Sequence, residues 1–297
     1  MLRWRLFLGV VVVAALAALV WLDFYSPGIF LLPLALVVAT LAAGEVQRLV
    51  CIRNVQPAAW GVYGGTLLVV AASGVPYLSH NPAPGGVVGP MEWTLLAVMI
   101  FVGVALSIEI ARFEQAELSA LRAALSVFAV AYAGGLLGML IHLRFVISDK
   151  WGAFALISLL VIVKMGDIGA YTVGRLVGRH KLAPKLSPGK TIEGFLGGLA
   201  FSAVSALALL QLVAPLIVPN APLGPWWRVV AFGLILGVAG TLGDLAESLL
   251  KRAAGVKDSS RWMPGYGGIL DMVDSLLLAA PVAYLLWIAG LVGPGMP

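Results

Sequence analysis

Residues 248–274 read SLLKRAAGVKDSSRWMPGYGGILDMVD, and they concentrate charge in a chain of which only 11% of the residues are charged. The segment holds four cations and three carboxylates, namely Lys251, Arg252, Lys257, Arg261, Asp258, Asp271 and Asp274. An apolar segment flanks it on each side, which places these charges where a membrane meets water. Ionisable groups at such a position are candidates for function by default.

The composition of the whole chain is that of an integral membrane protein. Hydrophobic residues make up 61% of its 297 residues, and the mean hydropathy is +1.01. These values lie far above those of soluble globular domains. A helix needs about 17–25 largely apolar residues to cross a bilayer. Nine segments approach this length: 6–22, 29–43, 58–78, 93–108, 121–143, 152–171, 195–218, 226–242 and 270–292.

The sequence therefore predicts an all-α, polytopic membrane protein with about nine transmembrane helices. The second segment is short and the sixth carries charge, so a count of eight or ten stays open. Residues 1–150 are expected to form a scaffold of helices, and residues 151–297 a catalytic region with loops at 172–194 and 251–268. The first segment is predicted to be a retained span because its apolar run is long, and a cleaved signal peptide stays the alternative.

The distribution of Lys and Arg predicts the orientation. Most of the 19 basic residues fall in alternate connections, on the same side as the N-terminus. They are Arg3, Arg5, Arg48, Arg53, Arg112, Arg122, Arg175, Arg179, Lys181, Lys185, Lys190, Lys251, Arg252, Lys257 and Arg261. The positive-inside rule then places the N-terminus and both loops in the cytoplasm and the C-terminus outside. An even span count, with the C-terminal tail inside, stays open.

The excess of basic residues limits which partners we expect for the chain. The pI near 9.5 reflects the positive-inside bias together with an anionic ligand. No basic block is interleaved with aromatic residues, so we expect no nucleic-acid partner. Cys51 is the one cysteine of the chain and is expected to be a packing residue.

A second polar block begins inside the sixth apolar segment. Lys164, Asp167 and Tyr171 recur at intervals of three and four, which puts a cation, a carboxylate and a phenol on one helical face. An intramembrane pair of Lys164 with Asp167 that only neutralises itself is the structural alternative. The loop that follows ends in Ser187-Pro188-Gly189-Lys190-Thr191-Ile192-Glu193-Gly194.

This loop has the side chains for binding phosphate. Ser187 and Thr191 offer hydroxyls, Lys190 offers a point charge, and a helix that starts near Thr191 favours an anion at its amino end. The segment is not a P-loop, because Pro184 stands where that motif has its first glycine and because we expect no strand before it. A solvated basic loop without a ligand remains the alternative.

Three carboxylates are expected to meet near the charged segment. Asp244 and Lys251 belong to one polar stripe at the end of the eighth apolar segment, while Asp271 and Asp274 share a face at the start of the ninth. Hard oxygen ligands of this kind suit Mg²⁺. The alternatives are that Asp271 is a helix cap, that Asp244 pairs with Lys251, and that Lys257 and Asp258 form a local ion pair.

Both blocks resemble the phosphatidate cytidylyltransferases, also called CDP-diacylglycerol synthases. The C-terminal block matches at Ser248, Lys251-Arg252, Lys257-Asp258, Ser260, Pro264, Gly267-Gly268, Asp271 and Asp274. The earlier block matches at Asp167, Ala170, Tyr171 and Gly174, and then at Ser187, Pro188, Lys190, Thr191, Glu193 and Gly194. Tyr266 stands where the family has His, Met272 where it has Arg, and Met263 where it has Leu, Ile or Phe.

The resemblance implies an enzyme of the cell or inner membrane that transfers CMP from CTP to phosphatidate, gives CDP-diacylglycerol and pyrophosphate, and uses one or two Mg²⁺ ions. It implies metal ligation by Asp244, Asp271 and Asp274, and phosphate contacts by Lys251, Lys257 and Arg252. The substrate-binding residues would include Asp167, Tyr171, Ser187, Lys190, Thr191, Glu193 and Asp258. The active site would face the cytoplasm at the ends of the C-terminal helices, and the protein would form a homodimer.

Two other functions stay open. A related enzyme could use another lipid phosphate as its acceptor or phosphorylate a lipid alcohol with CTP. A cation-coupled transporter could use Lys164, Asp167 and Asp244, but the sequence shows no internal repeat and its charges gather at the ends of the apolar segments rather than at their middle.

Overall fold

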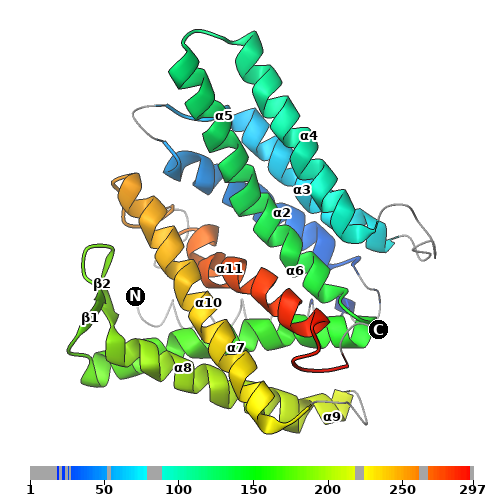
Figure 1. The fold of residues 1–297 in the computed structure, drawn as a ribbon, viewed down its shortest axis with the longest axis vertical. Coiled ribbons are helices and arrows are strands. Elements are labelled where there is room, and N and C mark those ends of the chain that lie inside the picture. The colour runs from blue at the N-terminus through cyan, green and yellow to red at the C-terminus, as the bar shows by residue number, and fades with distance from the viewer. Residues whose placement is uncertain are drawn as a thin grey trace. The chain divides into compact units, whose positions relative to one another are not determined.

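The computed structural model describes residues 28–51, 55–78, 89–217, 224–260 and 267–294, together with 19, 22, 23 and 26 (Figure 1). The chain divides into two compact units. One unit comprises Met1–His142 and Leu250–Met272, and the other comprises Leu143–Leu249 and Val273–Pro297. Each unit is described by itself below.

The first unit contains a bundle of apolar helices. They are α2 (Leu31–Leu49), α3 (Ala59–Leu78), α4 (Pro90–Ala111), α5 (Ala116–Val130), the π-helical turn η1 (Ala131–Gly135) and α6 (Leu136–Arg144), whose last residues already belong to the second unit. Helix α3 packs against α2, α4 and α5 (Figure 1). Val69, Phe101 and Val130, from α3, α4 and α5, meet in its buried core.

The second unit is built around two long helices that lie side by side (Figure 1). They are α7 (Asp149–Val177) and α8 (Ile192–Leu207), which continues through the π-helical turn η2 (Ala208–Val213) into α9 (Ala214–Ile217). Most of α10 (Trp226–Ala253) and of α11 (Ile269–Ile288) also belongs to this unit. Ser148 caps α7 by accepting a hydrogen bond from the Trp151 backbone N–H at 3.4 Å.

A β-hairpin connects α7 to α8 and corrects one expectation. Strands β1 (Lys181–Ala183) and β2 (Ser187–Thr191) pair antiparallel, with Lys181 opposite Thr191 and Ala183 opposite Ser187. The expectation that no strand precedes Gly189 is therefore wrong. The segment is still no P-loop, because its strands form a two-stranded hairpin and the expected glycine is Pro184.

A row of glycines on α10 allows close helix packing within the second unit. A Cβ atom on Gly233 would lie 2.7 Å from the Ser202 carbonyl oxygen of α8, and one on Gly240 would lie 3.0 Å from Val163 of α7. A Cβ atom on Gly243 would collide with the Asp274 carbonyl oxygen of α11. Small residues at helix contacts are the usual means of close approach in membrane proteins. They bring the polar end of α10 directly against α11.

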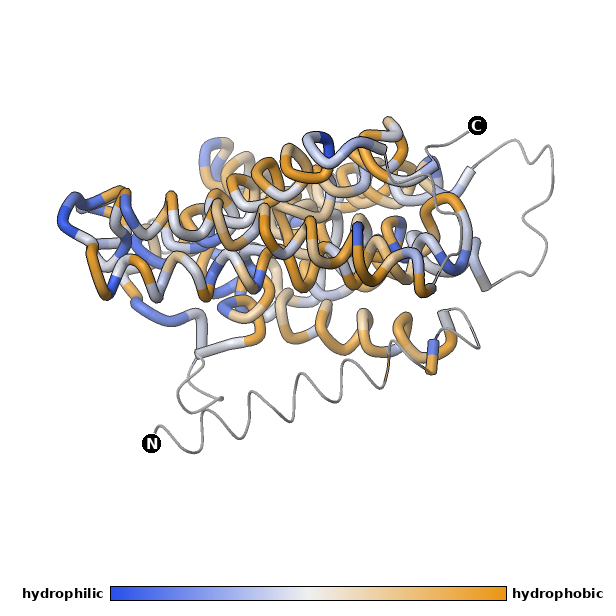
Figure 2. The backbone as a smooth tube through the Cα atoms, turned by 90° about the horizontal axis from the view of Figure 1, so that it is seen from below, coloured by the Kyte–Doolittle hydropathy of each residue, from blue (hydrophilic) through white to orange (hydrophobic). Residues whose placement is uncertain are grey.

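The structure confirms the prediction of an all-α polytopic membrane protein. Among the described residues, seven helical segments are long and apolar enough to cross a bilayer: Leu31–Leu49, Pro90–Ala111, Ala116–Arg144, Asp149–Val177, Ile192–Leu216, Trp226–Ala253 and Ile269–Ile288. Helix α3 provides a shorter apolar helix, Ala59–Gly74. Hydrophobic residues dominate the helices, and hydrophilic residues gather toward their ends and in the hairpin (Figure 2).

The span count and some boundaries differ from the expectation. The first expected span, 6–22, lies outside the described residues except for 19 and 22, so the count of nine stays a prediction. Helix α7 continues past residue 171 to Val177, and α10 continues past residue 242 to Ala253. Both extensions include polar residues, and the last turn of each holds a basic residue, Arg175 in α7 and Lys251 with Arg252 in α10, which the helix dipole favours. The predicted ends were too early because an apolar run in the sequence indicates only the part of a helix that lies in lipid.

Candidate active site

A closed polar triangle lies between α7 and α11 in the second unit. Lys164 Nζ donates to Asp167 Oδ2 at 3.2 Å and to Ser275 Oγ at 2.9 Å. Ser275 Oγ in turn donates to Asp167 Oδ2 at 3.2 Å. The predicted pair of Lys164 with Asp167 is thus present, and it extends to a hydroxyl on another helix. Both charged side chains are partly exposed, with relative areas of 42% and 41%.

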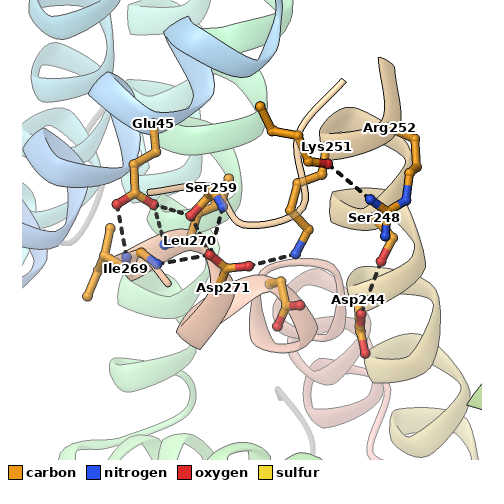
Figure 3. Close-up of polar contacts among 12 residues, drawn as sticks. Glu45, Asp244, Ser248, Lys251, Arg252, Ser259, Ile269, Leu270 and Asp271 are labelled. Atoms are coloured by element: carbon orange, nitrogen blue, oxygen red, sulfur yellow. Dashed lines mark hydrogen bonds and ion pairs between the residues drawn. The ribbon is translucent and has the colours of Figure 1, made fainter. Parts of the chain in front are cut away.

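The hairpin contacts α10 through an ion pair. Lys190 Nζ, from β2, lies 2.7 Å from Asp244 Oδ2, and the two side chains are 21% and 36% exposed. Ser248 Oγ donates to the other oxygen of Asp244 at 3.5 Å (Figure 3). Asp244 therefore pairs with Lys190, whereas the alternative considered above had it pair with Lys251. A cation suited to phosphate and a carboxylate suited to a metal are brought together here.

Asp274 lies beside this pair. Its side chain is buried, and its Oδ1 accepts a hydrogen bond from the Ser275 backbone N–H at 2.6 Å. The charges of Asp244 and Lys164 both act on it. The close approach of α10 to α11 at Gly243 accounts for this neighbourhood. The second unit thus joins Lys164, Lys190, Asp244 and Asp274 in one polar cluster.

Asp271 belongs to the first unit and is held by several donors (Figure 3). Its Oδ1 lies 2.6 Å from Lys251 Nζ, in a pair whose side chains are only 12% and 13% exposed. Its Oδ2 accepts hydrogen bonds from the backbone N–H groups of Ser259 and Gly268, both at 2.9 Å, and from Ser259 Oγ at 2.6 Å. The turn before the helix needs Gly267, which has a φ of +83°.

The carboxylates differ in how well they suit Mg²⁺. The described residues contain no group of three or more His, Cys, Asp or Glu side chains placed to hold a metal ion. Mg²⁺ usually takes one or two carboxylates and completes its shell with water and phosphate oxygens, and the neighbouring Asp244 and Asp274 fit that requirement. Both oxygens of Asp271 already accept hydrogen bonds. A shared site of all three carboxylates stays a prediction.

The hairpin loop is fixed by two side chains at the start of α8. Thr191 Oγ1 caps the helix by accepting a hydrogen bond from the Gly194 backbone N–H at 3.1 Å. Glu193 accepts hydrogen bonds from the backbone N–H groups of Arg179 and His180 at 3.0 and 3.2 Å, and His180 Nδ1 lies 2.6 Å from its Oε1. These contacts tie the beginning of the hairpin to its end. In the structure Glu193 closes the loop, and its predicted contact with the nucleotide stays a prediction.

The remaining predicted site residues are more exposed. The Tyr171 hydroxyl accepts a hydrogen bond from Arg175, and Arg252 donates to the Val256 carbonyl oxygen at 3.1 Å. Lys257 and Asp258 are exposed, and Ser187 is half-buried at the start of β2. Of the three departures from the family pattern, Met272 is half-buried on α11, whereas Met263 and Tyr266 lie outside the described residues. Arg261 lies outside them as well.

Sequence reasoning missed three polar residues of these clusters. Ser275 and Ser259 give no signal of their own, since serine is common in helices and loops. Glu45 does give one: it is a carboxylate near the end of the largely apolar helix α2, just past the expected segment 29–43, and it is 1% exposed. An ionisable residue inside a membrane helix is expected to have a partner or a function.

The comparison with known protein families decides the assignment. The model of the "Cytidylyltransferase family" matches residues 3–289. The chain belongs to the cytidylyltransferase family. The polar cluster around Asp244 and the one around Asp271 both lie within the matching region, which extends over nearly the whole chain.

Individual relatives agree with this family. A phosphatidate cytidylyltransferase of Staphylococcus saprophyticus is 33% identical over 220 residues, which cover 74% of this chain and 78% of that protein. A phosphatidate cytidylyltransferase of Staphylococcus aureus is 41% identical over 166 residues, or 56% of this chain and 59% of that protein. The uncharacterized protein YnbB of Escherichia coli is 38% identical over 160 residues, or 54% of this chain and 49% of that protein. The matches to the last two proteins thus span about half to three fifths of their length.

Proposed function

We propose that the protein is a phosphatidate cytidylyltransferase, which transfers CMP from CTP to phosphatidate and releases pyrophosphate. The observation that supports this most is the ion pair of Lys190 with Asp244, with Asp274 beside it. It joins a phosphate-binding cation on the hairpin to carboxylates that suit Mg²⁺. Family membership and the names of the staphylococcal relatives give the reaction class.

The chemistry requires no nucleophile from the protein. A phosphate oxygen of phosphatidate attacks the α-phosphorus of CTP, the bond from that phosphorus to the bridging oxygen breaks, and pyrophosphate takes the electron pair. Negative charge gathers on the attacking, central and leaving groups, and fixed cations stabilise it. Mg²⁺ held by Asp244 and Asp274 would supply further charge neutralisation when bound.

Residues of the second unit would divide the remaining work. Lys190 would hold the triphosphate, with Ser187 and Thr191 as hydroxyl donors on the same hairpin. Glu193 would keep the hairpin closed, and the triangle of Lys164, Asp167 and Ser275 would orient groups between α7 and α11. Contacts of Lys251, Lys257, Arg252, Asp258, Tyr171 and Asp271 with the substrates or metal belong to the proposal on the strength of the resemblance.

The proposal includes a location and an assembly. The N-terminus and the hairpin would face the cytoplasm, since most basic residues lie in connections on that side. A polar nucleotide could then reach the site while the acyl chains of phosphatidate stay in the bilayer. A homodimer follows from the resemblance, and chemical crosslinking in native membranes would test it.

The experiment that tests the proposal measures pyrophosphate release by the purified protein in detergent. CTP, Mg²⁺ and phosphatidate are left out one at a time, and CTP is replaced by the other nucleoside triphosphates. We expect release only with all three components, together with a lipid product whose mass exceeds that of phosphatidate by one cytidylyl group, which is CMP less one water. The variant Asp244→Asn is expected to keep its helical content and lose turnover.

The same assay separates the alternatives. Release with another lipid phosphate, and none with phosphatidate, would replace the acceptor but keep the reaction. Consumption of CTP with a lipid alcohol, giving CDP and a lipid phosphate, would identify a kinase. Folded protein that shows no CTP consumption with any lipid would refute the proposal.

A further inference from the structure

We propose that Glu45, on α2, is a positioning residue for the reaction, acting through Ser259 on the carboxylate of Asp271. The inference rests on the proposed function, in which Asp271 takes part, and it assigns a role to a residue outside both motif blocks. Glu45 lies 226 residues before Asp271 in the chain (271 − 45), yet both belong to the first unit.

Glu45 accepts two hydrogen bonds from the start of α11 and one from Ser259 in the loop before it (Figure 3). Its Oε1 accepts from the Ile269 backbone N–H at 3.1 Å, and its Oε2 accepts from the Leu270 backbone N–H at 2.9 Å. Its Oε2 also accepts from Ser259 Oγ at 2.8 Å. The first N–H groups of a helix have no partner within the helix, and a carboxylate there is favoured by the helix dipole. Glu45 therefore fixes where α11 begins.

Ser259 connects the two carboxylates. Its Oγ lies 2.8 Å from Glu45 Oε2 and 2.6 Å from Asp271 Oδ2. A hydroxyl has one proton to donate, so the two acceptors share it. Asp271 then continues the chain of contacts to Lys251, as Figure 3 shows. A change at Glu45 alters what Ser259 donates to Asp271, and thereby the orientation of the Asp271–Lys251 pair.

The glycine before α11 makes room for this arrangement. A Cβ atom on Gly268 would collide with the carboxylate of Glu45 and with Ser259 Oγ. The Gly268 backbone N–H also donates to Asp271 Oδ2 at 2.9 Å. The backbone of Gly268 is thus packed directly between Glu45 and Asp271. The contact with Glu45 explains why a glycine is needed at this position.

Capping of α11 does not by itself explain why Glu45 is an acid. Helix ends are usually capped by a side chain next to them in sequence, whereas Glu45 comes from a different helix and is buried. A buried charge is tolerated only where hydrogen bonds or an opposite charge compensate it. Glu45 has such bonds, and one of them leads to Asp271. Residues that orient a functional carboxylate from behind typically change activity about 10- to 100-fold when replaced.

The test compares Glu45→Gln with a matched control, Glu109→Gln. Glu109 is also a buried acid of the first unit, 6% exposed, and it pairs with Arg122 at 2.9 Å on α5. We expect Glu45→Gln to lower kcat about 10- to 100-fold with little change in the KM for CTP. Glu109→Gln is expected to lower the melting temperature and leave kcat unchanged. Equal losses of kcat at equal melting temperature in both variants would overturn the inference.

A double-mutant cycle tests the route through Ser259. Ser259→Ala removes the shared hydroxyl and leaves the contacts of Glu45 to the helix start. We expect Ser259→Ala to lower kcat and the added loss from Glu45→Gln to be much smaller in that background, because contacting residues in one network are not additive. If the fold-losses of kcat in the two single variants simply multiply in the double variant, the inference is overturned. Should Glu45→Gln fail to fold, Ser259→Ala decides alone, and a normal kcat overturns the proposal.

Amide hydrogen exchange separates this inference from the proposed function. In wild-type protein the N–H groups of Ile269 and Leu270 are expected to be protected, and Glu45→Gln is expected to expose them while Glu109→Gln does not. If the wild-type protein transfers no CMP, the proposed function fails, and this exchange still decides whether Glu45 positions the helix start. Equal protection in wild type and Glu45→Gln would overturn the inference.

Discussion

The close approach of α10 to α11 should be necessary for turnover, and Gly243→Ala tests it. The added methyl carbon would lie 3.0 Å from Ser275 Cα and 3.2 Å from the Asp274 carbonyl carbon. Carbon atoms pack best at about 3.5–4.0 Å, so the two helices must part by roughly 0.5–1 Å. Asp244 follows Gly243 directly and would move away from Asp274 with its helix.

The expected cost is larger in rate than in stability. Overpacking costs about 1–3 kcal/mol, and alanine gains about 1 kcal/mol over glycine within a helix, which leaves a net loss of about 0–2 kcal/mol. A displacement of about 1 Å at a reacting centre can lower the rate about 100-fold. Gly243→Ala should therefore lower kcat/KM for CTP about 100-fold and reduce the melting temperature only slightly.

The assay is initial-rate CMP transfer in detergent, with the melting temperature measured on the same preparation. Gly64→Ala on α3 is the matched control, because a Cβ atom there would meet nothing within 4 Å. It is expected to keep its activity and to be as stable as wild type or slightly more stable. Unchanged kcat/KM in folded Gly243→Ala would show that the α10–α11 contact does not set the geometry of the site.

Three further changes test local parts of the account. Thr191→Ala removes the cap on α8 and should cost about 1 kcal/mol, seen as a lower melting temperature; an unchanged value would mean that the cap adds nothing. Glu193→Gln should speed amide exchange at Arg179 and His180, because a neutral amide accepts less strongly than the carboxylate that now closes the hairpin; unaltered exchange would contradict that role. Lys251→Met should destabilise the protein by up to about 3–5 kcal/mol, since Asp271 is left buried without its counter-charge, and a stability equal to wild type in denaturant unfolding would argue against a structural pair.

The apolar segments and the signature blocks could be predicted because their signals are local. Apolar runs give the helices of a membrane protein almost directly. The pair of Lys164 with Asp167 follows from a spacing of three residues on one helix. The C-terminal ends of α7 and α10 could not be predicted in this way, because these ends extend past the apolar segments from which the helices were predicted.

The partners of the charged residues could not be read from spacing. Asp244 has Lys251 seven residues away on its own helix, yet it pairs with Lys190 of the hairpin, because the glycines of α10 fix its packing in the second unit. Glu45 contacts a serine that lies 214 residues later in the chain. Such contacts depend on how helices pack, and a single sequence carries no record of that packing.

The most direct test of the central claim follows the phosphorus atoms of CTP. Purified protein is given Mg²⁺, phosphatidate and CTP that carries a radiolabel on either its α- or its γ-phosphate, and the lipid and aqueous phases are counted separately. The account predicts that the α-label enters the lipid and the γ-label leaves as pyrophosphate, and that Asp244→Asn abolishes both. Transfer of the γ-label to lipid, or no transfer of the α-label by folded wild-type protein, would contradict it.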